Sequence, residues 1–197
     1  TCFFNKLHIT LVNFKLRHIC VFSIKKDMES KKNLVFLGMM GSGKTSIGNI
    51  ISKKLKLKFI DIDQIIEKEL NMKIPKIFET KGEKYFREVE ERITLKMLKK
   101  QKIVISLGGG SFLNKEIRKE ILKNHISFWL NWKSETLISR IYNNAKRPLV
   151  FKATKNELHE LINKRLRIYS MALYKVNCDN MTKNEIVKKI LQIYEAY

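Results

Sequence analysis

The chain has few of the residues that cross-link, interrupt or anchor a protein. Its 197 residues include three cysteines, two prolines and eight glycines. Three thiols without metal-ligand spacing indicate neither a disulfide framework nor a zinc site, and they favour a reducing, cytoplasmic compartment. The four histidines are likewise scattered. Because no uncharged apolar run approaches the roughly 18 residues that a membrane-spanning helix needs, we expect no membrane partner.

Acidic residues are also scarce, with 19 Asp and Glu against 40 Lys and Arg and a formal net charge of +21. Such an excess is typical of nucleic-acid-binding proteins when the cations cluster. Here the lysines are spread along the whole sequence without an interleaved aromatic platform. We therefore interpret the excess as a compositional bias that solvates helix faces and attracts anionic nucleotides and substrates, and we expect no nucleic-acid partner.

The chain divides into two parts of different pattern. Residues 1–32 contain no acidic residue before Asp27 and no regular periodicity. We interpret them as a non-functional or disordered N-terminal extension, with a transit segment as the alternative. From Asn33 onward, apolar runs of strand length alternate with helical stretches. This alternation predicts one α/β domain over residues 33–197, a three-layer α/β/α fold with a five-stranded parallel sheet flanked by helices.

The expected elements follow from this alternation. The expected strands are residues 34–37, 58–60, 103–106, 126–130 and 175–177. The expected helices are residues 44–55, 62–70, 74–80, 83–100, 115–123, 134–142, 155–173 and 183–194. Ligands of such folds lie at the carboxyl ends of the strands, so we expect the functional side chains directly after them.

A phosphate-binding pattern follows the first strand. Residues 38–45 read Gly-Met-Met-Gly-Ser-Gly-Lys-Thr, which fits the Walker A motif between a strand and a helix. Glycines let backbone N–H groups surround phosphate oxygens, Lys44 reaches the β- and γ-phosphates, and the Thr45 hydroxyl can ligate Mg²⁺. A purely structural turn is disfavoured because every fixed position is present. The predicted ATP-binding residues here are Gly38, Gly41, Ser42, Gly43, Lys44, Thr45 and Ser46.

Two further strand ends carry polar or glycine-rich signals. Asp61 and Asp63 follow the second strand; one carboxylate can hold Mg²⁺ through water while the other orients a hydroxyl. A helix N-cap explains either Asp equally well. Gly108, Gly109 and Gly110 follow the third strand, where three glycines allow a backbone to approach a ligand closely.

Several arginines complete the set of candidate residues. Arg87 and Glu90 lie three apart on one helical face, and an exposed ion pair of little energetic value is the alternative interpretation. Pro148 disfavours helical geometry at Arg147, so Arg147 is expected on a loop, which we interpret as a mobile lid over about residues 142–155. Arg165 lies on a later basic helix that, taken alone, would be a solvated face.

Together these ordered motifs resemble the shikimate kinase family from about Asn33 to the C-terminus. The resemblance rests on residues 38–48, 59–63, 66–67, 77–78, 82–90, 108–110, 140, 147–149, 165 and 169. It implies a P-loop kinase fold and transfer of the ATP γ-phosphoryl group to the 3-hydroxyl of shikimate, with Mg²⁺ as cofactor, shikimate and ATP as partners, and a monomeric, cytoplasmic enzyme. Another small-molecule P-loop kinase, of the gluconate or nucleoside-monophosphate type, is the alternative, followed by a non-enzymatic nucleotide-regulated module that binds nucleic acid.

The resemblance also implies individual roles. Lys44, Asp63 and Arg147 would be catalytic, with Asp63 binding and deprotonating the acceptor hydroxyl and Arg147 closing with the lid. Thr45 would bind Mg²⁺ directly and Asp61 through water, while Arg140 and Arg147 would join the ATP site, Arg140 near the adenine. The implied substrate-binding residues are Asp63, Arg87, Glu90, Gly108, Gly109, Gly110 and Arg165.

Five residues, at three places in the chain, depart from the family pattern. Asn71 replaces a usual glycine, and because Asn tolerates a left-handed conformation we expect the turn to survive. Ser106 and Leu107 precede the glycine triplet where a Thr is common. Arg167 and Ile168 replace a proline-containing step, which leaves Arg167 as a competitor of Arg165 for the second substrate-carboxylate contact. Quinate remains an alternative acceptor to shikimate.

Overall fold

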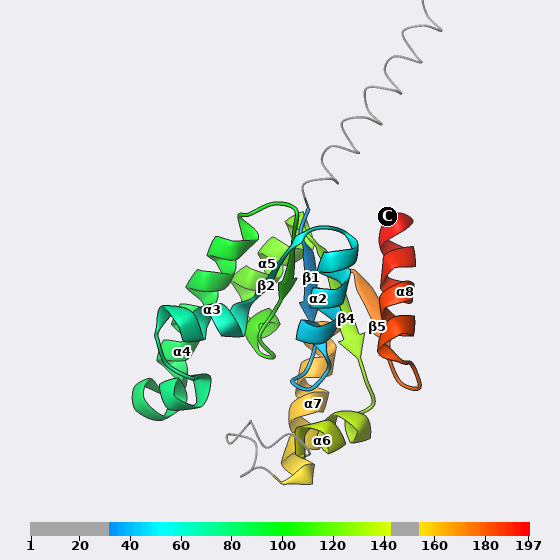
Figure 1. Cartoon of the computed structure of the whole chain (residues 1–197). Coiled ribbons are helices and arrows are strands. Elements are labelled where there is room, and N and C mark those ends of the chain that lie inside the picture. The colour runs from blue at the N-terminus through cyan, green and yellow to red at the C-terminus, as the bar shows by residue number, and fades with distance from the viewer. Residues whose placement is uncertain (1–31, 143–153) are drawn as a thin grey trace, which may run out of the picture. The chain divides into compact units, whose positions relative to one another are not determined.

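The computed structural model describes residues 32–142 and 154–197, and the fold is that of Asn33–Tyr197 (Figure 1). Apart from Lys32, the predicted N-terminal extension lies outside the described residues. So do residues 143–153 of the predicted lid, including Arg147. The extension and the lid therefore stay predictions.

A five-stranded parallel sheet in the order β2-β3-β1-β4-β5 forms the centre of the fold. Its strands are β1 (Leu34–Leu37), β2 (Lys58–Asp61), β3 (Ile103–Ser106), β4 (Ile126–Asn131) and β5 (Tyr174–Asn177). Every residue of β1 and β3 is buried, as expected for central strands with both faces covered by helices. The predicted fold class is confirmed, and each strand forms within one residue of its expected ends.

Helices cover both faces of this sheet. They are α2 (Lys44–Lys54), α3 (Ile62–Glu69), α4 (Ile74–Leu98), the 3-10 turn η1 (Ser111–Leu113), α5 (Lys115–Asn124), α6 (Ser134–Tyr142), α7 (Lys155–Tyr169) and α8 (Lys183–Glu195). Helix α2 packs beside α8, whereas α4 packs against α3 and α5 (Figure 1). None of the helices in the two described ranges is both long enough and apolar enough for a bilayer crossing.

Gly82 interrupts α4 with a non-helical φ of 80° and ψ of 169°, so the break expected between the helices over 74–80 and 83–100 is present as a kink. Two local details differ from the expected elements. Helix α7 ends at Tyr169 rather than at residue 173, because the chain turns there to enter β5. The turn η1 was not expected, since a single 3-10 turn has no periodic apolar signal. Asn71 does adopt the expected left-handed conformation, with φ 46°.

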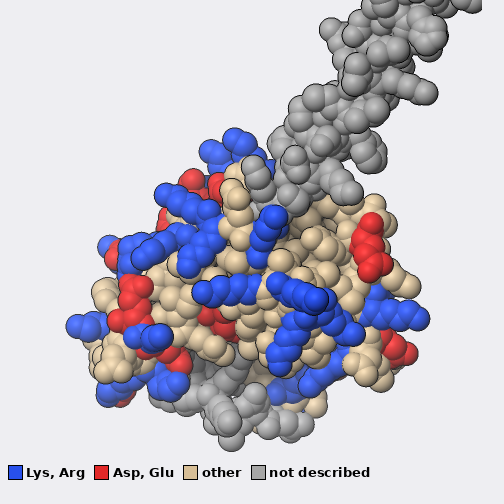
Figure 2. Space-filling view, turned by 45° about the horizontal axis from the view of Figure 1, so that its top comes forward, with Lys and Arg blue, Asp and Glu red and all other residues tan. Residues whose placement is uncertain are grey.

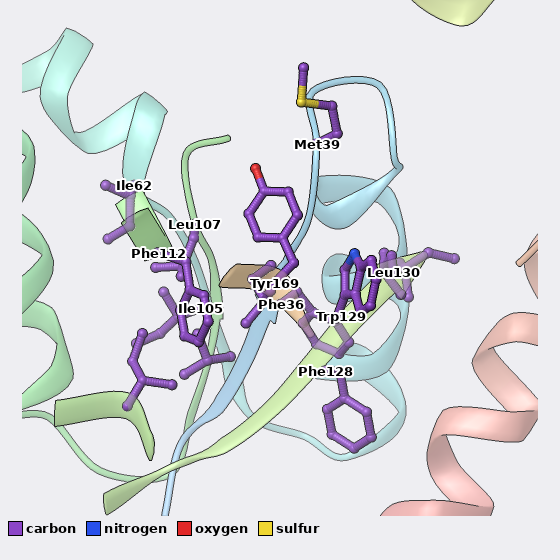
Figure 3. Packing of buried hydrophobic residues seen from close by; sticks show 14 of the residues in the cluster. Phe36, Met39, Ile62, Ile105, Leu107, Phe112, Phe128, Trp129, Leu130 and Tyr169 are labelled. Atoms are coloured by element: carbon purple, nitrogen blue, oxygen red, sulfur yellow. The ribbon is translucent and has the colours of Figure 1, made fainter. Parts of the chain in front are cut away.

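An aromatic cluster supports the strand ends. Phe36, Phe128 and Tyr174 stack along neighbouring strands, with ring centroids 5.6 and 5.3 Å apart. In Figure 3 the hydroxyl of Tyr169 points away from this cluster, towards the side on which Met39 lies. The Tyr169 hydroxyl thus leaves the aromatic cluster and donates to the Gly109 carbonyl oxygen, in the loop that follows β3.

The lysines gather in space more than their spread along the sequence indicates. Strands β2 and β3 are neighbours, with Lys58 in register with Ile103, so the connections that enter them lie side by side at the amino ends of the strands. Figure 2 shows Lys and Arg side chains over much of the molecule's surface, with fewer carboxylates among them. Seven exposed lysines without an ion pair in the described part of the chain lie in these two connections or at their ends: Lys53, Lys54, Lys56, Lys58, Lys99, Lys100 and Lys102.

Repulsion within this lysine group predicts that salt stabilises the fold. Like charges destabilise the compact state, and dissolved salt screens them. Raising NaCl from about 0.05 M to about 0.5 M should therefore increase Tm by about 2–4 °C, measured by circular dichroism.

A pair of double variants with equal net charge tests the location of the repulsion. Lys58→Gln with Lys100→Gln removes two unpaired charges and should raise Tm at low salt and weaken its salt dependence. Lys76→Gln with Lys164→Gln removes two lysines that are ion-paired with Glu79 and Glu160, and should raise Tm less. Equal behaviour of both double variants, or a Tm that falls with salt, would contradict the interpretation.

Candidate active site

The loop between β1 and α2 has the geometry of a phosphate cradle. Gly38, Gly41 and Gly43 have φ values of 139°, 79° and 88°, which side chains with a Cβ rarely adopt. The buried Lys44 side chain folds back across the loop, and its Nζ donates to the carbonyl oxygens of Gly38 and Met39 at 2.9 and 3.0 Å. The ammonium group is therefore held over the loop, where the phosphates of a nucleotide would lie.

The rest of the loop is fixed from α2 and from the end of β4. Ser42 is buried, and its carbonyl oxygen accepts a hydrogen bond of 2.9 Å from Trp132 Nε1. Arg140 of α6 stacks on the same Trp132 ring, with Cζ 3.6 Å from the ring centroid. Ser46 is exposed on the first turn of α2. The structure thus places the predicted nucleotide residues within its described ranges around one loop, with Arg140 beside it.

Thr45 and Asp61 meet at the end of β2. The Thr45 hydroxyl donates to Asp61 Oδ2 at 2.6 Å, while Asp61 Oδ1 accepts from the Gln64 backbone N–H at 3.3 Å. The N-cap interpretation and the metal-site interpretation of Asp61 are therefore compatible, because each uses a different oxygen. A hydroxyl and a carboxylate in contact beside a phosphate loop are hard oxygen ligands of the kind that Mg²⁺ prefers.

The glycine triplet leaves room for polar side chains from three elements. A Cβ on Gly108 would lie 2.5 Å from Glu90 Oε1, 2.8 Å from Asp63 Oδ1 and 2.9 Å from Ser111 Oγ. These three oxygens therefore surround one small volume that only a glycine leaves open. A Cβ on Gly110 would similarly lie 2.9 Å from Arg87 Cζ. Asp63, Arg87 and Glu90, which are distant in sequence from the triplet, are brought together with it.

Arg87 lies between two carboxylates of its own helix. Its Nη1 donates to Glu90 Oε2 at 2.7 Å, and its Nε and Nη2 donate to Glu83 Oε1 at 3.1 and 3.0 Å. Burial by itself would lower the pKa of Arg87, but the neighbouring Glu90 and Glu83 outweigh it and raise the pKa, so the guanidinium stays charged. The exposed-pair interpretation is wrong for Glu90, whose side chain is only 3% exposed.

Arg165 reaches the triplet from α7. Its Nη1 donates to the Gly109 carbonyl oxygen at 3.3 Å, and the Tyr169 hydroxyl donates to the same oxygen. Burial raises the pKa of Tyr169, which keeps this hydroxyl protonated as a donor. The buried Nε of Arg165 has no hydrogen-bond partner among the described residues, whereas the Arg167 side chain is exposed. The structure therefore brings Arg165, and not Arg167, to the glycine triplet.

The triplet and the phosphate loop are in contact. A Cβ on Gly109 would lie 3.3 Å from the backbone nitrogen of Met40. Ser111 and Trp132 were not identified from the sequence as parts of this region, and Glu83 was included in the family motif without an assigned role. Ser111 and Trp132 have no motif of their own, while the i, i+4 spacing of Glu83 and Arg87 was a usable signal for their ion pair.

The fold and the site define a P-loop kinase, with a phosphate loop on one side and a glycine triplet beside two arginines on the other. A family model described as "Shikimate kinase" matches residues 40–195. The chain belongs to the shikimate kinase family.

Curated relatives and solved structures agree with this assignment. The chain is 41% identical over 170 residues to the shikimate kinase of Bacillus subtilis, covering 82% of this chain and 88% of the relative. It is 38% identical over 160 residues to the shikimate kinase of Sulfurihydrogenibium, and the match covers 81% of this chain and 96% of the relative. A shikimate kinase from Acinetobacter baumannii in complex with shikimate is structurally similar, with TM-score 0.80, 28% identity and coverage of 87% and 97%.

Two glycine substitutions should separate the site from the scaffold. Gly108→Ala pushes a methyl group into Asp63 and Glu90, and should lower kcat/KM by about 100-fold, because small displacements of positioning groups cost about that much. Gly48→Ala places its Cβ 2.8 Å from Phe59 in the core and should cost about 1–3 kcal/mol of stability with kcat/KM unchanged below Tm. Steady-state kinetics and thermal melts test both; full activity of Gly108→Ala would contradict the site.

Proposed function

We propose that the protein transfers the γ-phosphoryl group of ATP to the 3-hydroxyl of shikimate and forms 3-phosphoshikimate and ADP. The observation that carries this proposal is the glycine triplet, which touches the phosphate loop at Met40 and the two arginines Arg87 and Arg165. Family membership supports it, and the similar Acinetobacter enzyme is described in complex with shikimate.

The pocket suits a small carboxylic acid with several hydroxyl groups. Guanidinium groups bind carboxylates through paired N–H donors, and Arg87 and Arg165 approach the triplet from different helices. Arg165 Nε has no hydrogen-bond partner within residues 32–142 and 154–197, so it is a donor that a substrate carboxylate would satisfy. We assign the substrate carboxylate to this arginine pair and contacts with the ring to the backbone of Gly108, Gly109 and Gly110.

Asp63 is the proposed acceptor-activating group. It projects from α3 to the space beside Gly108, where its carboxylate would orient the 3-hydroxyl and accept its proton as the oxygen attacks the γ-phosphorus. Lys44, fixed over the phosphate loop, would stabilise the charge on the phosphates. Phosphoryl transfer needs mainly such positioning and charge stabilisation from a protein.

The residues at the end of β2 fit a magnesium ion. Thr45 would hold it directly and Asp61 through water; when bound, Mg²⁺ neutralises charge on the β- and γ-phosphates. In the described ranges there is no cluster of three or more His, Cys, Asp or Glu side chains that could hold a metal. This agrees with an ion that takes much of its coordination from water and phosphates.

The remaining assignments extend the same proposal. Arg140, stacked on Trp132 next to the phosphate loop, would face the adenine. Arg147, outside the described residues, would close over the transferring phosphoryl group with the lid and help to exclude water. We also propose that the enzyme is a monomer of the cytoplasm.

A coupled ADP-release assay tests the function. Wild-type protein should release ADP from Mg·ATP at a rate that depends on the shikimate concentration. Comparing this rate with the rate at the same concentration of quinate shows which acceptor the enzyme prefers. Asp63→Asn should reduce kcat at least roughly 100-fold, the contribution of a positioned base, with KM for ATP nearly unchanged. Absence of shikimate-dependent ADP release would reject the proposal, and a collapse of ATP affinity in Asp63→Asn would place Asp63 in the metal site.

Two neighbouring arginines provide a matched test of the carboxylate assignment. Arg165→Ala should raise KM for shikimate by roughly 10- to 100-fold, the value of lost charge-assisted hydrogen bonds, and change KM for ATP far less. Arg167→Ala removes the same charge from an exposed position and should leave both constants within about twofold. The reverse pattern would assign the contact to Arg167.

A further inference from the structure

Ser111 forms a buried hydrogen bond beneath the glycine triplet. It is the first residue of η1, and its side chain is fully buried. Its Oγ donates to Glu90 Oε1 at 2.6 Å. The other oxygen of Glu90 accepts from Arg87 Nη1 at 2.7 Å. Ser111, Glu90 and Arg87 therefore form a linear chain of hydrogen bonds that runs from the turn after β3 to the guanidinium group.

We propose that Ser111 is a positioning residue for recognition of the substrate carboxylate, and that it acts through Glu90 on Arg87. The inference rests on the proposed function. The Ser111 side chain is fully buried; its role is to hold the orientation in which the Glu90 carboxylate faces Arg87.

The reason lies in how a carboxylate and a guanidinium pair. The terminal torsion of a Glu side chain is broad, so one hydrogen bond does not fix the plane of its carboxylate. A carboxylate with both oxygens available pairs with two nitrogens of an arginine, which is the stronger arrangement. Glu90 Oε1 accepts from Ser111 and Oε2 accepts from Nη1 of Arg87, so the two bonds together fix the plane of the carboxylate. In this orientation Glu90 leaves Nε and Nη2 of Arg87 to other partners.

The remaining donors of Arg87 are only weakly held. Its Nε and Nη2 bond to Glu83, whose side chain is 66% exposed. An exposed pair of this kind contributes little, so a substrate carboxylate can replace Glu83. Glu90, at 3% exposure, is the partner that stays in place. Its orientation therefore determines the direction in which the rest of the guanidinium points.

The backbone of η1 does not depend on the Ser111 hydroxyl. Arg118 Nη1 donates to the carbonyl oxygens of Phe112 and Leu113 at 3.0 and 2.9 Å, and Asn114 Nδ2 donates to Glu91 Oε2 at 2.8 Å. These contacts fix the turn to α4 and α5. Ser111→Ala should therefore keep the fold and remove only the bond to Glu90.

The test is steady-state kinetics of Ser111→Ala with shikimate and ATP varied separately. KM for shikimate should rise roughly five- to tenfold, less than the roughly 10- to 100-fold of a direct hydrogen bond to a charged group, because Ser111 acts only through Glu90. KM for ATP and kcat should stay within about twofold, since loss of uniform binding raises KM alone. Ser111→Cys, which keeps a weaker donor of similar size, should give a smaller rise and serves as the second variant if the Ala form is unstable.

The matched control is Ser127→Ala. Ser127 is equally buried and its Oγ also makes one hydrogen bond, accepting from the Leu173 backbone N–H at 2.9 Å, but it lies on β4 away from the triplet. Ser127→Ala should lower Tm about as much as Ser111→Ala does, and it should leave KM for shikimate unchanged. The inference would be overturned if Ser111→Ala and Ser127→Ala had the same KM for shikimate. It would also be overturned if Ser111→Ala raised KM for shikimate and KM for ATP equally.

A double-mutant cycle tests whether Ser111 acts through Glu90. In a Glu90→Gln background, Ser111→Ala should change KM for shikimate less than twofold, because coupled residues are not additive. The full five- to tenfold effect in that background would overturn the proposed route. If the wild-type protein turns over shikimate and Ser111→Ala has the wild-type KM for shikimate, only this inference is rejected. If the wild-type protein does not turn over shikimate, the proposed function is rejected and the inference with it.

Discussion

The contact between Gly109 and the phosphate loop is the constraint on which the rest of the site depends. A Cβ on Gly109 would lie 3.3 Å from the Met40 nitrogen, closer than ordinary van der Waals contact, so the two loops pack tightly against each other. Both loops follow adjacent parallel strands, β1 and β3, so the sheet itself determines their separation. A phosphoryl group carried by one loop is therefore within reach of an acceptor held by the other, without a large movement of the sheet.

Around this contact the charged groups are arranged in two ways. Glu90 is buried with both oxygens paired, and removing either partner leaves a buried carboxylate oxygen unsatisfied, which is costly. Asp61 is also paired, but its partners, Thr45 and the start of α3, are groups beside the phosphate loop. The first arrangement gives rigidity to the acceptor pocket, and the second leaves oxygen ligands near the phosphates. Neither requires the large surface excess of lysines, seven of which lie at the amino ends of β2 and β3.

Features encoded by local sequence could be predicted, while features that depend on packing could not. The phosphate loop was predictable because its glycines, Lys44 and Thr45 are contiguous, and the parallel sheet because its strands are short apolar runs. The burial of Glu90 was not predictable, because it results from the packing of α4 against η1, and η1 is a turn without a sequence signal. The spacing of Arg165 and Tyr169 could have decided between Arg165 and Arg167. Arg165 is four residues before Tyr169 and lies on the same helical face, and the Arg165 and Tyr169 side chains both donate to Gly109. The roles assigned to individual residues stay predictions, and those of Arg147 and the lid concern residues outside the described ranges.

The most direct test of the central claim is a crystal structure of the protein with ADP, Mg²⁺ and shikimate. We predict that the ADP phosphates lie in the loop formed by Gly38, Gly41 and Gly43, and that the shikimate carboxylate lies within hydrogen-bond distance of Arg87 and Arg165. The 3-hydroxyl should contact Asp63 on the side facing the phosphate loop. A shikimate carboxylate bound to Arg167, or a ring bound away from residues 108–110, would contradict the account.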